Sequence, residues 1–199
     1  YTKRFPAAKA LVSLPLARFD GAIAVDGETI QVEGWSGSEN HNWGSRHTDH
    51  YAWGQVAGFA SHPESFLEVA TAQLKLGPFW SPAFTPMVLR HRRKEYRLTG
   101  LVRALRATAK LDRFTFDFAS RNAEVELLGS LSAPAETFVG LAYRNPSGGA
   151  KQCLNSKLAS CCLRITDRTR GESETLVALN RAAFEILTDD TGHGIALQA

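Results

Sequence analysis

Residues 113–118 have the sequence Arg-Phe-Thr-Phe-Asp-Phe (RFTFDF), and this stretch points most directly to the fold class. In an extended chain, successive side chains lie on opposite faces. The three phenylalanines therefore share one face, and the threonine and the aspartate share the other. This period of two is typical of a β-strand with one buried face, and it predicts a strand here.

The same alternation recurs elsewhere along the chain, at 30–33, 124–127 and 161–166. Turn signals separate the alternating segments, and we expect turns at Asp26-Gly27, Asn145 to Gly149, Arg170-Gly171 and Asp189-Asp190. Signals spaced in this way are typical of an antiparallel meander that closes into a barrel or sandwich. The predicted fold class is all-β, an antiparallel lipocalin-like (calycin) barrel with little helix.

Helical patterning is scarce. The best helix candidate is 99–108, where Thr99 could cap a short apolar stripe. The apolar residues of 174–187 fit either a helix or a strand. Asn155 to Lys157 interrupts the alternation of 151–166 and indicates a β-bulge, and the basic run Arg90 to Lys94 is expected at a solvated hairpin tip.

Composition excludes several classes of protein. The chain has 199 residues, 44% of them hydrophobic and 22% charged, which is ordinary for a globular protein. A net charge of +3 is too small to indicate nucleic-acid binding. No apolar run approaches the roughly 20 residues of a transmembrane helix. We therefore expect neither a nucleic-acid partner nor a transmembrane segment.

The three cysteines are Cys153, Cys161 and Cys162. An odd number with one adjacent pair is a poor disulfide framework and matches no common zinc-binding spacing. Buried free thiols in a reducing compartment are the simplest interpretation. No signal peptide is visible, so we expect a cytoplasmic protein.

The densest group of functional side chains lies at 39–55, ENHNWGSRHTDHYAWGQ. His50 to Phe59 is predicted to be a strand on which Tyr51, Trp53 and Gln55 share a face. Aromatic area with a few polar groups is what a small-molecule pocket requires. The segment is therefore a candidate pocket wall.

A metal site in this segment is the obvious alternative, because imidazole is the commonest protein ligand for metals. The spacing of His41, His47 and His50 argues against it, since it matches neither a helical H-E-x-x-H pair nor a Cys/His finger. On a strand, His47 and His50 would also point to opposite faces. We expect no metal here.

Glu68 is the second candidate. In 65–76 (SFLEVATAQLKL) it shares the alternation of Phe66 and Ala70, which predicts a carboxyl group on an apolar face. Desolvation would raise the pKa of such a carboxyl, so that it could act as a general acid. The alternative is a Glu68 carboxylate near the barrel mouth or paired with Arg46 or Arg90.

Trp35 to Gly44 (WSGSENHNWG), followed by H-x-x-x-Y-x-W-G-Q ending at Gln55, resembles the lipocalin-like superfamily of carotenoid 1,2-hydratases, tocopherol cyclases and AttH-type proteins. The resemblance extends loosely over 20–190. It implies a calycin-like fold, with two antiparallel barrels in full-length members. Residues 1–199 would then be a single lipocalin-like barrel domain, the C-terminal part of a longer protein. The start at Tyr1 rather than Met agrees with that expectation.

The resemblance also implies site residues. The His and Trp of the family block fall on His41 and Trp43, and a later aromatic-x-Asp pair falls on Phe66 and Glu68. This sequence departs twice at that pair, with Phe in place of Tyr and Glu in place of Asp. The acid is kept and the phenol is lost, which brings hydration itself into question while leaving proton donation open.

Two hypotheses from different classes follow. In the first, the chain is a cofactor-independent cyclase, hydratase or isomerase of an apolar, isoprenoid-like molecule. Glu68 and His41 would then be catalytic, and Trp43, Tyr51, Trp53, Gln55 and Phe66 would bind the substrate. In the second, the chain is a non-catalytic carrier or accessory domain for a lipophilic ligand. A missing N-terminal barrel or a second copy of the chain could complete the pocket in either case. A third class, a metal-dependent cupin-like enzyme, lacks the ligand spacing.

Overall fold

The computed structural model describes residues 7–145 and 148–198. Strands dominate these residues, and the prediction of an all-β fold with little helix is confirmed. The elements are β1 (Ala8–Val25), β2 (Glu28–Gly44), β3 (His50–Ala57), β4 (Phe66–Gln73), β5 (Lys75–Leu76), β6 (Phe79–Trp80), β7 (Met87–His91), β8 (Lys94–Leu98), α1 (Leu101–Arg106), β9 (Thr108–Asp112), β10 (Thr115–Arg121), β11 (Val125–Ser132), a 3-10 turn (Ala135–Thr137), β12 (Val139–Arg144), β13 (Ala150–Asp167) and β14 (Glu172–Thr188).

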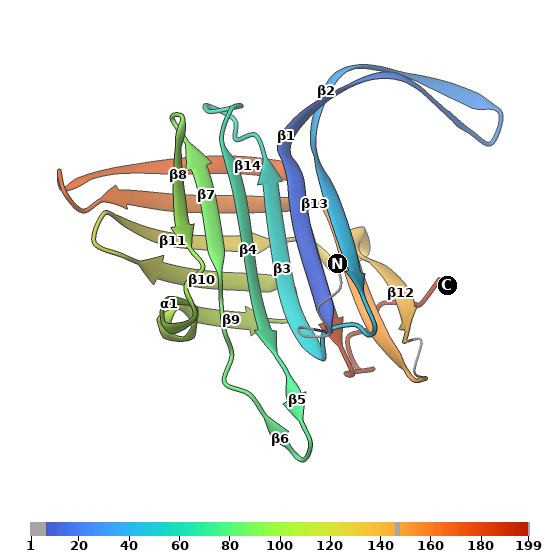
Figure 1. Ribbon diagram of the computed structural model, residues 1–199. Helices are drawn as coiled ribbons and strands as arrows, with labels where there is room; N and C mark the ends of the chain where they lie inside the picture. Colours follow the sequence, from blue (N-terminus) through green and yellow to red (C-terminus); the bar gives the residue numbers. More distant parts are fainter. Residues whose placement is uncertain (1–6, 146–147, 199) are drawn as a thin grey trace.

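Most strands join one antiparallel sheet in the order β8-β7-β4-β3-β14-β13-β11-β10-β9, with β12 also paired to β13. Figure 1 shows that β3, β4, β7 and β8 form one layer, while β9 to β11 cross behind it. Among the described residues, the edge strands β8 and β9 are not paired with each other, so the sheet stays open. The predicted closed barrel is corrected to an open sheet folded over on itself.

The fold-over occurs in β13 and β14, which belong to both layers. Residues 152–156 of β13 pair with the end of β14 that borders β3. Residues 161–167 pair with the other end of β14 on one side and with β11 on the other. The register of the two strands shifts between Ser156 and Ala159 and again before Cys161. Such bulges bend a strand and let one sheet turn a corner. The bulge predicted at Asn155 to Lys157 is confirmed.

The hydrophobic core lies between the two layers. Buried residues from the first layer, such as Val56, Leu67 and Leu89, join Phe116, Phe118 and other residues of the crossing strands in one cluster. The phenylalanine alternation that predicted β10 is thus a core face, although Phe114 lies just before the strand and is only partly buried.

Gly54 shows how tightly the layers meet. A Cβ at this position would overlap Cδ1 of Leu131, which comes from β11 in the crossing layer. The glycine between Trp53 and Gln55 is therefore a point of close approach on the core side of β3.

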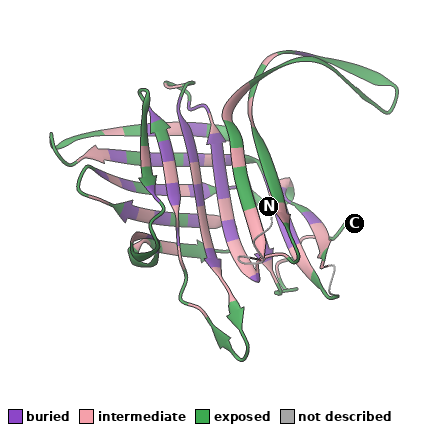
Figure 2. Cartoon of the chain, in the orientation of Figure 1, coloured by how far each residue is buried: buried purple, intermediate pink, exposed green. Residues whose placement is uncertain are grey.

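The β1–β2 hairpin forms a separate two-stranded sheet. Its turn lies at Asp26-Gly27, as predicted, and both residues have positive φ, as a two-residue hairpin turn requires. One end of the hairpin lies beside β3, while the end with the turn extends away from the body of the molecule (Figure 1) and is exposed throughout 18–31 (Figure 2).

Three local predictions also have an outcome. The helix predicted within 99–108 is α1, but Gly100 occupies the N-cap position in place of Thr99 and provides no side-chain hydrogen bond. The ambiguous segment 174–187 is strand β14. The basic run lies at the end of the β7–β8 hairpin, where Arg92 and Arg93 adopt positive φ at the exposed turn, but His91 within the run is buried. Within the described ranges, no helix has the length and apolar character needed to cross a membrane.

Candidate functional site

A cavity of about 700 Å³ lies between the β1–β2 hairpin and the face of β3 and β4 that points away from the core. This volume is within the range of small-molecule sites. The polar and aromatic side chains of its lining include Trp43, Arg46, His47, Tyr51, Trp53, Glu68, Tyr143, Lys157 and Glu185, together with Lys9 and Arg144. A second cavity of about 350 Å³ shares Asn40, Trp53 and Lys157 with the first. The two therefore adjoin beneath the hairpin.

Strand alternation places the key residues of β3 on this face. Ala52 and Val56 point into the core, so Tyr51, Trp53 and Gln55 point toward the hairpin, and their predicted common face is confirmed. On β4 the core residues are Leu67 and Val69, and Glu68 lies on the opposite face. Glu68 thus lies over the cavity rather than beside the core.

The Glu68 carboxyl is largely withdrawn from solvent. Trp53 Nε1 donates a hydrogen bond to Glu68 Oε1 at 3.0 Å across the β3–β4 pair. Burial raises the pKa of the Glu68 carboxyl, and the hydrogen bond from Trp53 offsets part of that rise. The predicted desolvation of this acid is confirmed by its surroundings.

Arg46 and Arg90, the two predicted partners of Glu68, each form an ion pair with another carboxylate. Arg46 Nη2 lies 2.6 Å from Asp49 Oδ2, which is itself held by the backbone N–H of Lys75 at 2.8 Å. Arg90 Nε lies 3.5 Å from Glu95 Oε2 on the neighbouring strand β8. Trp53 is the hydrogen-bond partner of Glu68 in the part of the chain that the structure describes.

A second carboxyl group, Glu185 of β14, lines the same cavity. The Tyr51 hydroxyl donates a short hydrogen bond to Glu185 Oε1, and Asn155 Nδ2 donates to Oε2 at 2.5 Å. Burial, together with the Glu185 charge, raises the pKa of the Tyr51 phenol, which therefore stays protonated as a donor. Glu185 also faces Trp53 in the strand register, so the indole lies between the two carboxyl-bearing strands.

Lys157 supplies a positive charge near the carboxyl groups. Its Nζ lies 5.6 Å from the centroid of the Trp53 ring, within the range of a cation–π interaction. The β-bulge at 156–159 is the local reason why this side chain reaches the cavity from β13.

Tyr143 of β12 and His47 close one side of the cavity, with ring centroids 4.8 Å apart. The buried Cys153 thiol lies beside Tyr143, and burial and the Glu185 charge raise the pKa of that thiol to about 12. Cys153 and Cys161 are buried free thiols, as predicted, whereas Cys162 is exposed.

Side-chain hydrogen bonds attach the hairpin to the sheet. The Ser38 hydroxyl donates to Gln55 Oε1, and Gln55 Nε2 donates to Asn40 Oδ1 at 3.0 Å. Gln55 is buried by these contacts and lines the smaller cavity. Gln55 is therefore placed both to hold the hairpin against β3 and to contact a molecule in the smaller cavity.

The candidates predicted from the sequence are only partly brought together. Trp43, Tyr51, Trp53 and Glu68 line the larger cavity, and Gln55 lines the smaller one. Phe66 is buried and belongs to neither lining. His41 is exposed, stacks on Trp43 at 5.1 Å, and likewise lies outside both linings.

Glu185 and Tyr143 are the cavity residues that sequence reasoning missed. In β14, Phe184 and Ile186 are buried on the core face, and the charged residue between them points to the cavity. That alternation was the available signal, but it is hidden in a segment whose apolar residues also fit a helical period.

Two solved structures are distantly similar to this chain. Kievitone hydratase from Nectria haematococca is 11% identical, with a TM-score of 0.49 over 88% of this chain and 51% of that one. An AttH-like protein from Nitrosomonas europaea is 12% identical, with a TM-score of 0.40 over 72% of this chain and 53% of that one. The chain spans about half the length of each. No protein-family model matches the sequence, and no curated protein matches it.

Proposed function

We propose that this protein binds an apolar, isoprenoid-like small molecule beneath the β1–β2 hairpin and transforms it by acid catalysis without a cofactor. The observation that carries the proposal is the Glu68 carboxyl, which has a pKa raised by burial and lines a cavity of about 700 Å³. A carboxyl group whose pKa is raised by burial is better suited to general-acid catalysis than a solvated one.

In the proposed reaction, Glu68 delivers its proton to one carbon of a carbon–carbon double bond. The π electrons of that bond form the new C–H bond, and the other carbon becomes cationic. The faces of Trp43 and Trp53 would stabilise this cation. Addition of water gives hydration, attack by a second double bond gives cyclisation, and loss of a neighbouring proton gives isomerisation.

Each of these outcomes releases one proton, which needs an acceptor. His41, predicted to be catalytic, is outside the cavity linings. We assign the role of acceptor to Glu185, which lines the cavity and already accepts hydrogen bonds from Tyr51 and Asn155. Exchange with solvent then restores both carboxyl groups for the next turnover.

The test is to incubate the protein with a panel of prenyl alcohols, farnesol and geranylgeraniol among them, and to analyse the products by mass spectrometry. Glu68→Gln keeps the shape and the acceptor for Trp53 but cannot donate an acidic proton, so turnover should fall by about a hundredfold or more. Glu39→Gln, at an exposed position of β2, is the matched control. Unchanged turnover in Glu68→Gln would refute the mechanism.

A non-catalytic carrier is the second candidate. The observation in its favour is that Glu68 Oε1 already accepts a hydrogen bond from Trp53, while His41 is not part of the cavity lining. Quenching of tryptophan fluorescence by the same prenyl alcohols, reduced in Trp53→Phe and unaccompanied by product, would favour the carrier over the enzyme.

A further inference from the structure

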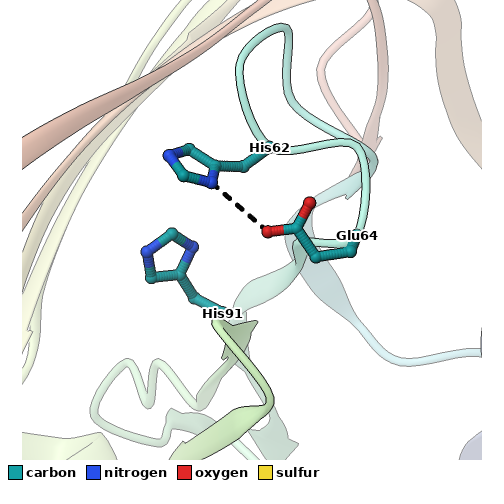
Figure 3. Close-up of side chains that lie close together, drawn as sticks. All are labelled: His62, Glu64 and His91. Atoms are coloured by element: carbon teal, nitrogen blue, oxygen red, sulfur yellow. Dashed lines mark hydrogen bonds and ion pairs between the residues drawn. The ribbon is translucent and has the colours of Figure 1, made fainter.

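A second group of reactive side chains lies outside the cavity, where the β3–β4 loop meets β7. His62 and Glu64 come from the loop and His91 ends β7, and one ligand atom from each residue lies within 4.8 Å of the others. Figure 3 shows both imidazole rings facing the Glu64 carboxylate. We propose that His62, Glu64 and His91 bind a divalent transition-metal ion such as Zn²⁺.

The donor atoms suit this class of ion. Two imidazoles and one carboxylate form a nitrogen and oxygen set that zinc sites commonly use. His62 Nδ1 and Glu64 Oε1 are 3.3 Å apart, which is about the separation of two ligands around a tetrahedral ion with bonds of roughly 2 Å. Closing the site therefore requires rotation of side chains and no rearrangement of strands.

Glu174 of β14 supplies the outer contacts that orient both rings. Its Oε1 lies 2.6 Å from His91 Nε2, and its Oε2 lies 3.6 Å from His62 Nε2. By accepting the Nε2 proton of His91, Glu174 leaves the lone pair of that ring on Nδ1, whereas its approach to His62 Nε2 is longer than a hydrogen bond. Histidine ligands are usually oriented by a carboxylate or carbonyl in this way.

The backbone around the ligands is fixed by its own hydrogen bonds. Phe59 and His62 exchange backbone hydrogen bonds at 3.1 and 3.2 Å, and the N–H of Ser65 bonds to the carbonyl of His62 at 3.0 Å. Ala60 N–H donates to the carbonyl of Val177 in β14, at 2.9 Å. The loop that carries two ligands is thus attached to the strand that carries Glu174.

The burial of the three ligands differs, which leaves the site open on one side. His91 is only 4% exposed, whereas Glu64 has a 53% exposed side chain. A water molecule can complete the coordination on the Glu64 side, as in zinc sites with three protein ligands.

Two neighbours compete with the ion. The Ser65 hydroxyl lies 2.8 Å from His91 Nδ1, so ion binding exchanges that hydrogen bond for a coordinate bond. Arg92 Nη2 lies 3.0 Å from Glu174 Oε2, and its exposed side chain balances the charge of Glu174. Both contacts hold the residues together when no ion is bound.

The proposal does not depend on the proposed function of the cavity, and it is tested by direct binding. Untagged chain of residues 1–199, stripped with a chelator and dialysed, is titrated with Zn²⁺ by calorimetry and with Co²⁺ by visible absorption. We expect about one ion per chain. His62→Gln and Glu64→Gln should each weaken binding by at least tenfold, and Glu174→Gln by roughly tenfold to a hundredfold.

His50→Gln and Glu39→Gln are the matched controls, since they change the same residue types outside the cluster: His50 begins β3, at the end opposite the loop, and Glu39 is exposed on β2. Circular dichroism of every variant checks that the fold is retained. Substitutions of His62 and Glu64 are preferred because both residues lie on the loop, outside the core. Absence of stoichiometric binding to the unaltered chain would overturn the proposal. Full binding in both His62→Gln and Glu64→Gln would overturn it as well.

Discussion

At the scale of single residues, Glu68 combines two properties that seldom coexist on a strand. It lies opposite the core residues Leu67 and Val69, and yet the covering hairpin withdraws it from solvent. Its surroundings therefore favour the neutral acid over the carboxylate. The same preference that suits Glu68 for proton donation has a consequence for stability.

We predict that Glu68→Gln stabilises the protein at neutral pH. The raised pKa means that the folded state binds the Glu68 proton more tightly than the unfolded state does. Stability therefore declines as the pH rises from about 4.5, the ordinary value of a glutamate, toward the pKa of the folded state, and the penalty persists above it. Glutamine carries no such penalty. The melting temperature of Glu68→Gln should exceed that of the unaltered protein at pH 7.

Measurement at about pH 3 provides the internal control for this prediction, because the carboxyl is then almost fully protonated in both states and its pH-dependent contribution should vanish. Glu28→Gln at the exposed end of the hairpin should change neither value. Equal melting temperatures of Glu68→Gln and the unaltered chain at pH 7 would contradict the assigned pKa direction.

At the scale of elements, the β1–β2 hairpin is the least integrated part of the fold. It pairs with no strand of the large sheet, and residues 18–31 are exposed throughout. Its side-chain bonds to β3 come from Ser38 and Asn40, near the end that covers the cavity. Elements with few buried contacts open with a low free-energy cost.

Hydrogen exchange should separate the hairpin from the sheet. We predict that amides of residues 18–31 exchange much faster than those of residues 161–165 in the centre of β13, where the side chains on the core face are buried. Mass spectrometry of proteolytic peptides measures both segments in one experiment. Similar protection of the two segments would show that the hairpin is held by more than these contacts.

The elements also show what sequence can predict. Alternation is a local property, so the sequence predicted β3, β10, β11 and the second half of β13 well. It could not assign the faces of β4, because both are covered: Leu67 and Val69 by the crossing layer, and Ala70 and Ala72 by the hairpin. Phe66 and His41 were misplaced for a different reason. Phe66 shares the face of Glu68, and His41 lies on β2 between two lining residues, but which positions the cavity reaches depends on distant partners.

The metal-ligand cluster illustrates a similar limit. His62 and Glu64 are close in sequence, but His91 and Glu174 join them only because β7 ends and β14 begins near the same loop. The histidines at 41, 47 and 50 are the densest in sequence. Among the described residues, however, it is His62, Glu64 and His91 that lie close together in space.

At the scale of the whole molecule, β13 and β14 make the two layers one cooperative unit. Each strand runs from one layer into the other across the bulge at Ser156 to Cys161, and the core between the layers is a single cluster. Neither layer can lose its packing without exposing the buried face of the other.

Core truncations in the two layers should therefore affect one and the same transition. We predict that Leu89→Ala in β7 and Leu163→Ala in β13, both fully buried, each lower the free energy of unfolding by about 2–5 kcal/mol. Leu128→Ala, at an exposed position of β11, should cost less than about 0.5 kcal/mol. Urea unfolding followed by circular dichroism and by tryptophan fluorescence measures all three, and two separated transitions would contradict a single unit.

The cavity occupies the face of β3 and β4 that the core does not use. Side chains there can be exchanged without repacking the interior, since the residues that hold the layers together alternate with those that line the cavity. Substitutions at Tyr51, Trp53 or Ala70 can consequently change the lining of the cavity while the scaffold persists. A fold arranged in this way can diversify its chemistry over evolutionary time at little risk to its own folding.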